Sequence, residues 1–331
     1  MSRKLKFGLL LPHFCEHASV EKCLEGARRA EAYGFDSVWV RDHLVFKPHP
    51  GEGNNDNSHI ESLLLLSAVA AVIKRLTLGT AMTICHRHPI HLAQSFAGLS
   101  AISNGRVIMG LGLGGFPHEF AAAGRPSGLQ DRANLARLNI EICRRLWAGE
   151  TLSHESDYFK FANVALKPTP TEHIPIYIGG STPASCRRAV EFADGWMPAR
   201  INFATFGARI EYLHKLCQQA GKPMVQTAVM PFTTVGKNRQ SALDGIDVKG
   251  LIDEAHNFST WVKPVSGKFS TLEDIAGVIL AGSPADIVRQ SRIYQEIGAD
   301  HIVYDLRLRF RDWYEQIDLL GQEVLPELKG A

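Results

Sequence analysis

Two short apolar segments of the chain end next to histidines that could take part in proton transfer. The segment Leu5–Leu11 runs into His13, and the segment Ser37–Val40 runs into Asp42 and His43. Histidine is the side chain whose ordinary pKa lies nearest neutral pH, and a neighbouring carboxylate can fix its tautomer or supply charge. We therefore predict His43, with Asp42, as the catalytic pair. The alternatives are a helix cap or a backbone hydrogen bond for His43, and a plain loop for His13.

Three further histidines have a spacing that raises the question of a metal site. His86 and His88 lie two residues apart and His91 follows. Pro89 opens a helix, however, so His86 and His88 lie on a turn where they need not face the same way. Arg87 on this turn could instead meet an anion. We expect no metal site, and a metal-dependent hydrolase is the alternative that bound zinc would support.

A glycine-rich turn follows the apolar segment that begins at Arg106. Gly110, Gly112 and Gly115 match the letters of the GxGxxG dinucleotide fingerprint. Pro117 follows them, we expect the next helix to begin more than ten residues later, and no acidic residue ends a following strand at the required distance. We therefore reject a dinucleotide site. These glycines would instead let a flat ligand approach the backbone closely.

The strongest sign of an anion site follows the apolar segment Pro175–Ile178. The turn after it consists of Gly179, Gly180, Ser181 and Thr182. Pro183 then occupies the first helical position, so backbone N–H groups and two hydroxyls gather at a helix N-terminus. This arrangement suits a phosphate group. The alternative is an ordinary helix cap without a ligand, because Ser and Thr cap helices routinely.

The elements that must position these residues alternate along the chain. Apolar runs read as strands at 5–11, 37–40, 76–81, 106–111, 175–178, 195–198, 225–235 and 301–305. Segments with apolar residues at three- and four-residue spacing read as helices at 20–33, 62–73, 91–102, 132–147, 183–192, 205–219 and 285–297. The strands are continuously apolar, which is typical of parallel strands buried on both faces. Eight such units predict an α/β fold, a (β/α)8 TIM barrel, with chemistry at the C-terminal ends of its strands.

We predict one domain over residues 1–331, because no Ser/Gly-rich linker divides the chain. The stretch of about 237–282 is longer than one strand–helix unit requires and predicts an insertion after the seventh strand, placed over the barrel mouth. The loop Pro48–Ser58 is a second candidate lid.

Composition excludes several classes of protein. The 36 Lys and Arg residues against 34 Asp and Glu residues leave a net charge of +2, without a basic run, so we expect no nucleic-acid or membrane partner. Six cysteines without a CxxC pair indicate free thiols in a reducing compartment. The N-terminal apolar run is too short for a signal peptide. We therefore expect a cytoplasmic enzyme.

Several segments in order resemble the bacterial luciferase-like superfamily of flavin- and deazaflavin-dependent oxidoreductases. They are FGLLLPHF at the start, GFDSVWVRDHL at 34–44, LTLGTAMT at 76–83, the long segment 87–115, LWAGE at 146–150, PIYIGGSTPASCRRAVEFADGWMPA at 175–199 and AGSPADIV at 281–288. The resemblance covers nearly the whole chain. It is specific for the superfamily and much less specific for the member.

The resemblance implies a (β/α)8 barrel that forms a homodimer and binds its cofactor at the mouth. The ring would lie against the peptide after the third strand, a non-prolyl cis bond at Ala81–Met82. The implied cofactor-binding residues are Ala81, Met82, Thr83, Gly112, Gly114, Gly179, Gly180, Ser181 and Thr182. Asp42 and His43 match the Asp-His pair of the members that use coenzyme F420, in which the histidine lies close to the ring.

Coenzyme F420 is the predicted cofactor and FMN the alternative. With F420, a hydride would pass to or from a small organic substrate. With FMN, reduced cofactor from a partner reductase would react with oxygen, and a third alternative is flavin binding without turnover. The chain departs from the sugar-phosphate dehydrogenases of the family, which have a glutamate where Gly115 stands and a tryptophan where Lys47 stands. Their acid–base residues are therefore not carried over, and Glu119 is left unassigned.

Overall fold

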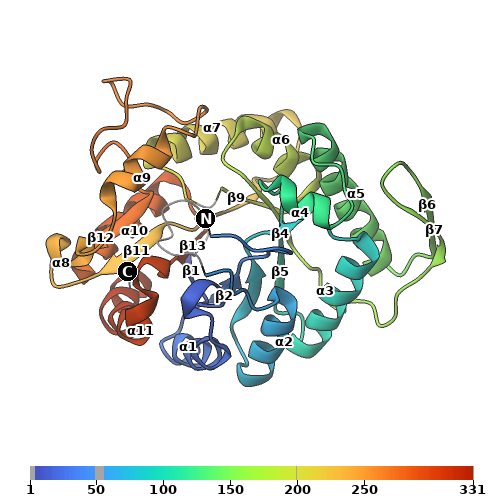
Figure 1. Ribbon diagram of the computed structural model, residues 1–331, viewed down its shortest axis with the longest axis horizontal. Coiled ribbons are helices and arrows are strands. Elements are labelled where there is room, and N and C mark those ends of the chain that lie inside the picture. Colours follow the sequence, from blue (N-terminus) through green and yellow to red (C-terminus); the bar gives the residue numbers. More distant parts are fainter. Residues whose placement is uncertain (1–3, 49–55, 199, 331) are drawn as a thin grey trace.

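Eight parallel strands close into a barrel in the computed structural model, which describes residues 4–48, 56–198 and 200–330 (Figure 1). In chain order they are β1 (Lys6–Leu10), β2 (Ser37–Val40), β3 (Thr77–Thr80), β5 (Val107–Gly112), β8 (Ile176–Gly179), β9 (Gly195–Met197), β10 (Gln226–Val229) and β13 (His301–Tyr304). Each pairs with the next along the chain, and β1 pairs with β13 to close the ring. The predicted TIM barrel is confirmed.

The helices form a ring outside the strands (Figure 1). They are α1 (Val20–Ala32), α2 (Ser62–Val72), α3 (Pro89–Ser103), α5 (Leu129–Trp147), α6 (Pro183–Phe192), α7 (Phe203–Gln219) and α10 (Pro284–Ile297). Local sequence sets their starts: the side chains of Ser19, Asn202 and Ser283 accept hydrogen bonds from first-turn amides of α1, α7 and α10. Since helices cover the outer face of the barrel, every residue of β2, β5 and β13 is buried.

An indole ring fills part of the barrel interior. A Cβ on Gly8 would lie 2.9 Å from Nε1 of Trp39, and one on Gly79 would lie 2.2 Å from its Cε3, so both glycines make room for the ring. Trp39 Nε1 donates to Ser37 Oγ at 2.7 Å, and this hydroxyl lies 2.8 Å from His301 Nε2. Burial lowers the pKa of His301 to about 3, so this imidazole is neutral at pH 7.

The predicted strand Val225–Val235 is wrong as a single element. It divides at Pro231, which lacks the N–H group that a continuous ladder requires. The first half is β10, and the second is β11 (Phe232–Val235), which pairs in parallel with β12 (Ile279–Gly282) and keeps one bridge, from Phe232 to Asp305, to the chain after β13. Between β11 and β12 lie α8 (Arg239–Leu243) and α9 (Val248–Ala255), in the stretch predicted as the insertion.

Several smaller elements were not predicted. They are the short strand β4 (Thr83–Ile84), the helix α4 (Pro117–Ala122), the hairpin β6 (Leu152–Glu155) and β7 (Lys160–Val164), and the C-terminal helices α11 (Trp313–Leu319) and α12 (Leu325–Lys329). The hairpin projects from the rim of the molecule (Figure 1). The expectation that the next helix begins more than ten residues after Gly115 is wrong, because α4 begins at Pro117. Of the predicted lid Pro48–Ser58, residues 49–55 lie outside the described residues.

Candidate active site at the barrel mouth

His43 lies at the C-terminal end of β2, where the fold places reacting groups. Its Nδ1 is 3.3 Å from both carboxylate oxygens of Glu119, and its Nε2 is 3.2 Å from Nη2 of Arg41. A guanidinium can only donate, so Nε2 accepts and the ring proton resides on Nδ1, which donates to the carboxylate. The geometry therefore selects one neutral tautomer of His43.

Glu119, which sequence reasoning left unassigned, is the carboxylate that orients His43. Helix α4 carries it, its side chain is 1% exposed, and its Oε1 accepts from the backbone amides of Leu44 at 2.8 Å and Val45 at 3.2 Å. Burial raises the pKa of Glu119, but the hydrogen bonds that it accepts from His43 and from the two amides together hold this pKa below its ordinary value. Glu119 thus fixes both the imidazole and the loop that follows it.

Asp42 does not contact the ring nitrogens of His43, so the prediction that it fixes the tautomer is wrong. Its carboxylate accepts from Nε and Nη2 of Arg87 at 2.8 and 2.5 Å, from the amide of Ile84 at 3.1 Å and from Ser62 Oγ at 3.3 Å. Successive side chains of an extended segment point in opposite directions, which separates the two neighbours. Asp42 therefore connects the segment after β2 to the segment after β3, through Ile84 and Arg87, instead of orienting His43.

We expect Asp42→Asn to destabilise the fold. Burial raises the pKa of Asp42, but the hydrogen bonds and charge of Arg87 and the amide of Ile84 hold it below its ordinary value. Breaking such a buried pair costs about 3 kcal/mol. Because the pKa is depressed on folding, this stability is present above about pH 4 and disappears as the pH falls through the folded-state value. Urea unfolding at pH 7 and at pH 3 measures both effects.

The exposed partner of the same arginine provides the control for this prediction. Glu61 lies 2.9 Å from Arg87 Nη2 but is 39% exposed, so Glu61→Gln should cost less than about 1 kcal/mol. Equal losses for Asp42→Asn and Glu61→Gln would contradict the assignment of Asp42 to a structural role.

His13 lies beside this site, with both ring nitrogens occupied by backbone groups. Its Nε2 accepts from the amide of Arg41 at 2.9 Å, so the proton resides on Nδ1, which lies 3.1 Å from the carbonyl of Ile60. Burial and the neighbouring positive groups lower its pKa well below the ordinary value. His13 is therefore a neutral residue that ties the first strand end to the second.

Sequence reasoning missed His59, which completes a group of three imidazoles. Its ring lies edge-on to His13 at a centroid distance of 4.8 Å and to His43 at 5.6 Å. Burial lowers its pKa to about 4, and among the described residues its Nε2 has no hydrogen-bond partner. It borders a cavity of about 450 Å³ lined by His43, Leu44, Val45, Phe46, Asn57, His59, Glu61 and Arg87. Only the folded chain brings it there, from a loop without a motif.

The peptide bond between Ala81 and Met82 is cis, which confirms the expectation drawn from the resemblance. The Met82 side chain lies across three glycines of β5 and β8. A Cβ on Gly110, Gly112 or Gly179 would lie 2.5, 3.0 or 2.8 Å from its atoms. These strand-end glycines therefore make room for the side chain of Met82, whose Cβ lies next to Gly112 and whose Cγ lies next to Gly179. The Met82 side chain then forms the floor against which a flat ligand could rest.

Two neighbouring predicted residues also have structural roles. Thr83 Oγ1 donates to Thr80 Oγ1 at 2.9 Å, which anchors the turn after β3. Gly114 has a φ of +71°, which favours glycine, and a Cβ there would lie 2.7 Å from Ile84 Cγ2.

The turn from Gly179 to Thr182 forms the N-terminus of α6. Thr182 Oγ1 caps the helix by accepting from the amide of Ser185 at 3.3 Å. Gly180 has a φ of +109°, and its carbonyl accepts from Trp196 Nε1 at 2.8 Å. Within the described part of the chain, the backbone N–H groups of Ser181 and Thr182 donate to no acceptor. Thr182 therefore caps α6, as the alternative interpretation predicted. The amides of Ser181 and Thr182 are in addition suited to bind the phosphate of a cofactor.

The insertion closes over this turn from one side. Trp261 Nε1 donates to Ser181 Oγ at 3.2 Å, and Arg209 bridges the carbonyls of Ser181 and Thr260 at 3.0 and 2.6 Å. The long segment between β11 and β12 is thereby tied to the candidate phosphate site.

The histidines near α3 make separate structural contacts. His88 Nδ1 caps α3 by accepting from the amide of Ile90 at 3.3 Å, while His86 meets the edge of Phe120 at 5.4 Å. No group of three or more potential ligands is found in residues 4–48, 56–198 and 200–330. The described chain also contains no helix that is long and apolar enough to cross a membrane.

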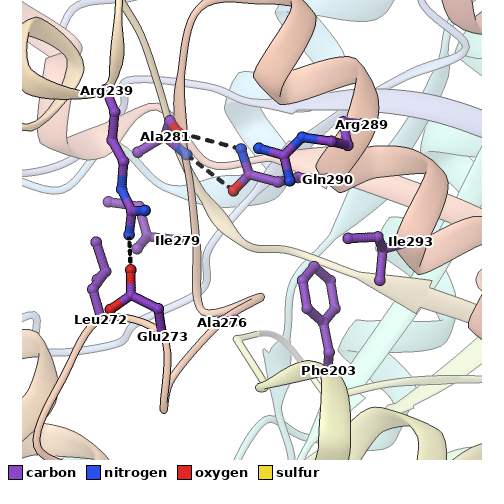
Figure 2. Close-up of a pocket in the computed structure, with 10 residues that line it drawn as sticks. All are labelled: Phe203, Arg239, Leu272, Glu273, Ala276, Ile279, Ala281, Arg289, Gln290 and Ile293. Atoms are coloured by element: carbon purple, nitrogen blue, oxygen red, sulfur yellow. Dashed lines mark hydrogen bonds and ion pairs between the residues drawn. The ribbon is translucent and has the colours of Figure 1, made fainter.

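A second cavity, of about 250 Å³, lies away from the mouth and contains none of the predicted site residues. Figure 2 shows its walls, where Arg239 pairs with Glu273 at 2.7 Å and the Gln290 amide bonds to the backbone of Ala281. Glu119 and the imidazoles of His13, His43 and His59 lie at the barrel mouth instead.

The structure is a closed TIM barrel with an oriented histidine and a cis peptide at its mouth, the end of the barrel at which TIM-barrel enzymes carry their active sites. The family model described as luciferase-like monooxygenase matches residues 5–301. The chain therefore belongs to the luciferase-like monooxygenase family.

Curated relatives and solved structures agree with this family. The chain is 28% identical over 335 residues to an F420-dependent glucose-6-phosphate dehydrogenase of Amycolatopsis mediterranei (strain U-32), covering 93% of this chain and 94% of the relative. It is 33% identical over 192 residues to an F420-dependent hydroxymycolic acid dehydrogenase of Mycobacterium tuberculosis (strain ATCC 25618 / H37Rv). This match covers 57% of this chain and 51% of the relative. The structure of an F420-dependent secondary alcohol dehydrogenase with an F420-acetone adduct superposes with a TM-score of 0.81 at 22% identity, over 98% and 99% of the two chains.

An FMN-containing relative has the same fold. The oxygenating constituent of 3,6-diketocamphane monooxygenase from Pseudomonas putida, in complex with FMN, superposes with a TM-score of 0.76 at 18% identity, over 98% of each chain. The fold by itself therefore does not distinguish the two cofactors.

Proposed function

We propose that the protein is a coenzyme F420-dependent dehydrogenase or reductase. One observation carries the proposal: His43 stands at the mouth as a neutral imidazole oriented by the buried carboxylate of Glu119. Oxidation of an alcohol releases a hydride from carbon and a proton from oxygen, so it needs a proton acceptor beside the reacting carbon. The names of the relatives support the choice of F420.

The residues of the mouth fit such a cofactor. The amides of Ser181 and Thr182 would bind its phosphate, and Met82 would support its ring. Bound there, the deazaflavin supplies or accepts the hydride. Nε2 of His43 would take the substrate proton in the oxidation and return it in the reduction, while Glu119 holds Nδ1 and stabilises the imidazolium.

The choice between F420 and FMN is testable by direct titration. We expect the purified protein to bind F420 with micromolar affinity and FMN at least tenfold more weakly, followed by quenching of cofactor fluorescence. Tighter binding of FMN would favour the monooxygenase alternative, in which a partner reductase supplies reduced cofactor. Failure of both to bind would contradict the oxidoreductase proposal itself.

We further propose that the protein acts on a small organic substrate, assembles as a homodimer and is located in the cytoplasm.

A further inference from the structure

His59 is an imidazole of the barrel mouth to which no structural contact of its ring nitrogens gives a role. Within the described part of the chain, neither ring nitrogen has a hydrogen-bond partner. Nε2 is shut off from solvent, whereas Nδ1 is not among the sealed atoms. The ring borders the cavity of about 450 Å³ that His43 also lines. Nδ1 is therefore the nitrogen that a molecule in this cavity can reach.

The backbone on both sides of His59 is fixed to the segment after β1. The amide of Cys15 donates to the carbonyl of Ser58 at 2.8 Å. The amide of Ile60 donates to the carbonyl of His13 at 2.9 Å. A side chain whose backbone is held in this way is positioned before a ligand arrives, which reduces the entropic cost of binding.

The spacing of His59 and His43 is set by Phe46, which packs against both rings. The centre of the buried Phe46 ring lies 5.2 Å from that of His43 and 5.5 Å from that of His59. The two imidazoles are 5.6 Å apart, centre to centre, with their planes at 84°. Two nitrogens that each bond to one oxygen at about 2.8 Å lie about 4.6 Å apart, with each ring centre about 1 Å behind its nitrogen. The observed spacing therefore suits one oxygen atom held between His43 and His59.

The tautomer of His59 follows from which of its nitrogens is buried. Burial lowers the pKa of the imidazole to about 4, so the ring is neutral at pH 7 and carries a single N–H group. A buried N–H group without an acceptor is rarer in proteins than a buried acceptor without a donor. The proton therefore belongs on Nδ1, which offers it to the cavity, and Nε2 keeps its lone pair.

The other walls of the cavity favour an uncharged ligand. Leu44 and Val45 are 48% and 41% exposed and form an apolar side. The ionic groups among the described lining residues are Glu61 and Arg87, which pair with each other at 2.9 Å. A small molecule with one oxygen and an apolar tail matches this combination of walls.

We propose that Nδ1–H of His59 donates a hydrogen bond to the substrate oxygen, and that the substrate is a small neutral alcohol or the corresponding ketone. The inference rests on the proposed function, because it places the reacting oxygen beside Nε2 of His43. As the carbon of the alcohol gives up its hydride to the cofactor, the O–H proton passes to His43 and the carbonyl bond forms. His59 keeps its own proton and stabilises the negative charge that develops on the oxygen.

Two measurements on the cofactor-free full chain test the hydrogen bond itself. Ring-nitrogen NMR, with the His59 signals identified by their loss in His59→Leu, should show a neutral ring protonated at Nδ1 at pH 7. Fluorine NMR titration with trifluoroethanol should show binding that His59→Leu weakens at least fivefold. His59→Asn should retain most of the affinity, because its amide nitrogen can take the place of Nδ1.

Turnover provides a further readout with any alcohol that the wild-type protein oxidises. His59→Leu should lower kcat by about 10²-fold with little change in KM, since the hydrogen bond strengthens as charge develops on the oxygen. His59→Asn should stay within about tenfold of the wild type. His214→Leu, at an exposed position of α7, is the matched control and should keep full turnover.

The proposal is overturned by a His59 ring that is charged or protonated at Nε2 at pH 7. It is also overturned if trifluoroethanol does not bind, or binds His59→Leu as tightly as the wild type. A failure of the proposed function looks different, because F420 would then support no alcohol oxidation while the two NMR results stand. If His59→Leu fails to fold, His59→Gln, which places its amide nitrogen nearer the position of Nε2, carries the same comparison with His59→Asn.

Discussion

His43→Gln should lower turnover by about 10²- to 10⁴-fold, the range that general acid–base catalysis contributes. Glutamine can still donate an amide hydrogen to Glu119 and accept from Arg41, so the loop at the mouth keeps its contacts. What the variant loses is the nitrogen lone pair that can be protonated reversibly. The measurement is the absorbance change of F420 on any alcohol or ketone that the wild-type protein turns over.

The affinity for F420 distinguishes catalysis from binding in this experiment. We expect the dissociation constant of the cofactor to change by less than about twofold in His43→Gln, since ring and phosphate contacts lie on other strands. His91→Gln, an exposed position on α3, is the matched control and should retain full turnover. Unchanged turnover in His43→Gln would remove His43 from the mechanism, and a parallel loss of cofactor binding would make it a binding residue.

Gly110→Ala is expected to be the most destabilising single-methyl change at the mouth. The new Cβ would lie 1.9 Å from the carbonyl oxygen of Thr80 and 2.5 Å from Met82 Sδ. The Thr80 backbone cannot retreat easily, because its hydroxyl bonds to both the amide and the carbonyl of Gly110, at 3.0 and 3.1 Å. Overpacking against backbone costs about 3 kcal/mol or more. Thermal and urea unfolding would register the loss.

Gly115→Ala provides the control at the same turn. A Cβ at Gly115 has no atom within 4 Å, and its φ lies outside the range that requires glycine, so we expect a change below about 0.5 kcal/mol. Similar stability of the two variants would show that Met82 and Thr80 do not fill the space as the structure has them. The pair thus tests the turn around the cis peptide without requiring a substrate.

The two carboxylates near His43 have partners that differ from those expected from their positions in the sequence. Asp42 is adjacent in sequence and seemed the natural partner, yet it bonds to Arg87, 45 residues away. Glu119, 76 residues from His43, is the actual partner. Its helix was not predicted, because six residues after a glycine-rich turn carry too little periodicity to be recognised.

The stacking of arginines on phenylalanines at the mouth has the same origin. Each of these residues is an ordinary one in its own segment, and neither spacing nor a motif marks it. The contacts, among Arg200, Phe232, Arg307, Phe14, Arg41 and Phe46, form because barrel closure brings the ends of β9, β10, β13, β1 and β2 side by side. Gly110, Gly112 and Gly179 show the opposite case. The sequence indicated that a side chain is excluded at these positions, but only the structure shows that the side chain of Met82 occupies the space.

The sequence by itself determined the barrel, the order of its strands, the cap of α6 and the position of His43 at a strand end. These follow from apolar periodicity and from capping chemistry, which act over a few residues and are therefore legible locally. Only the tertiary structure decided which carboxylate orients His43, that the seventh strand is interrupted at Pro231, and which side chains share the mouth. Those features depend on the closure of a ring of parallel strands, which places residues far apart in sequence within hydrogen-bonding distance.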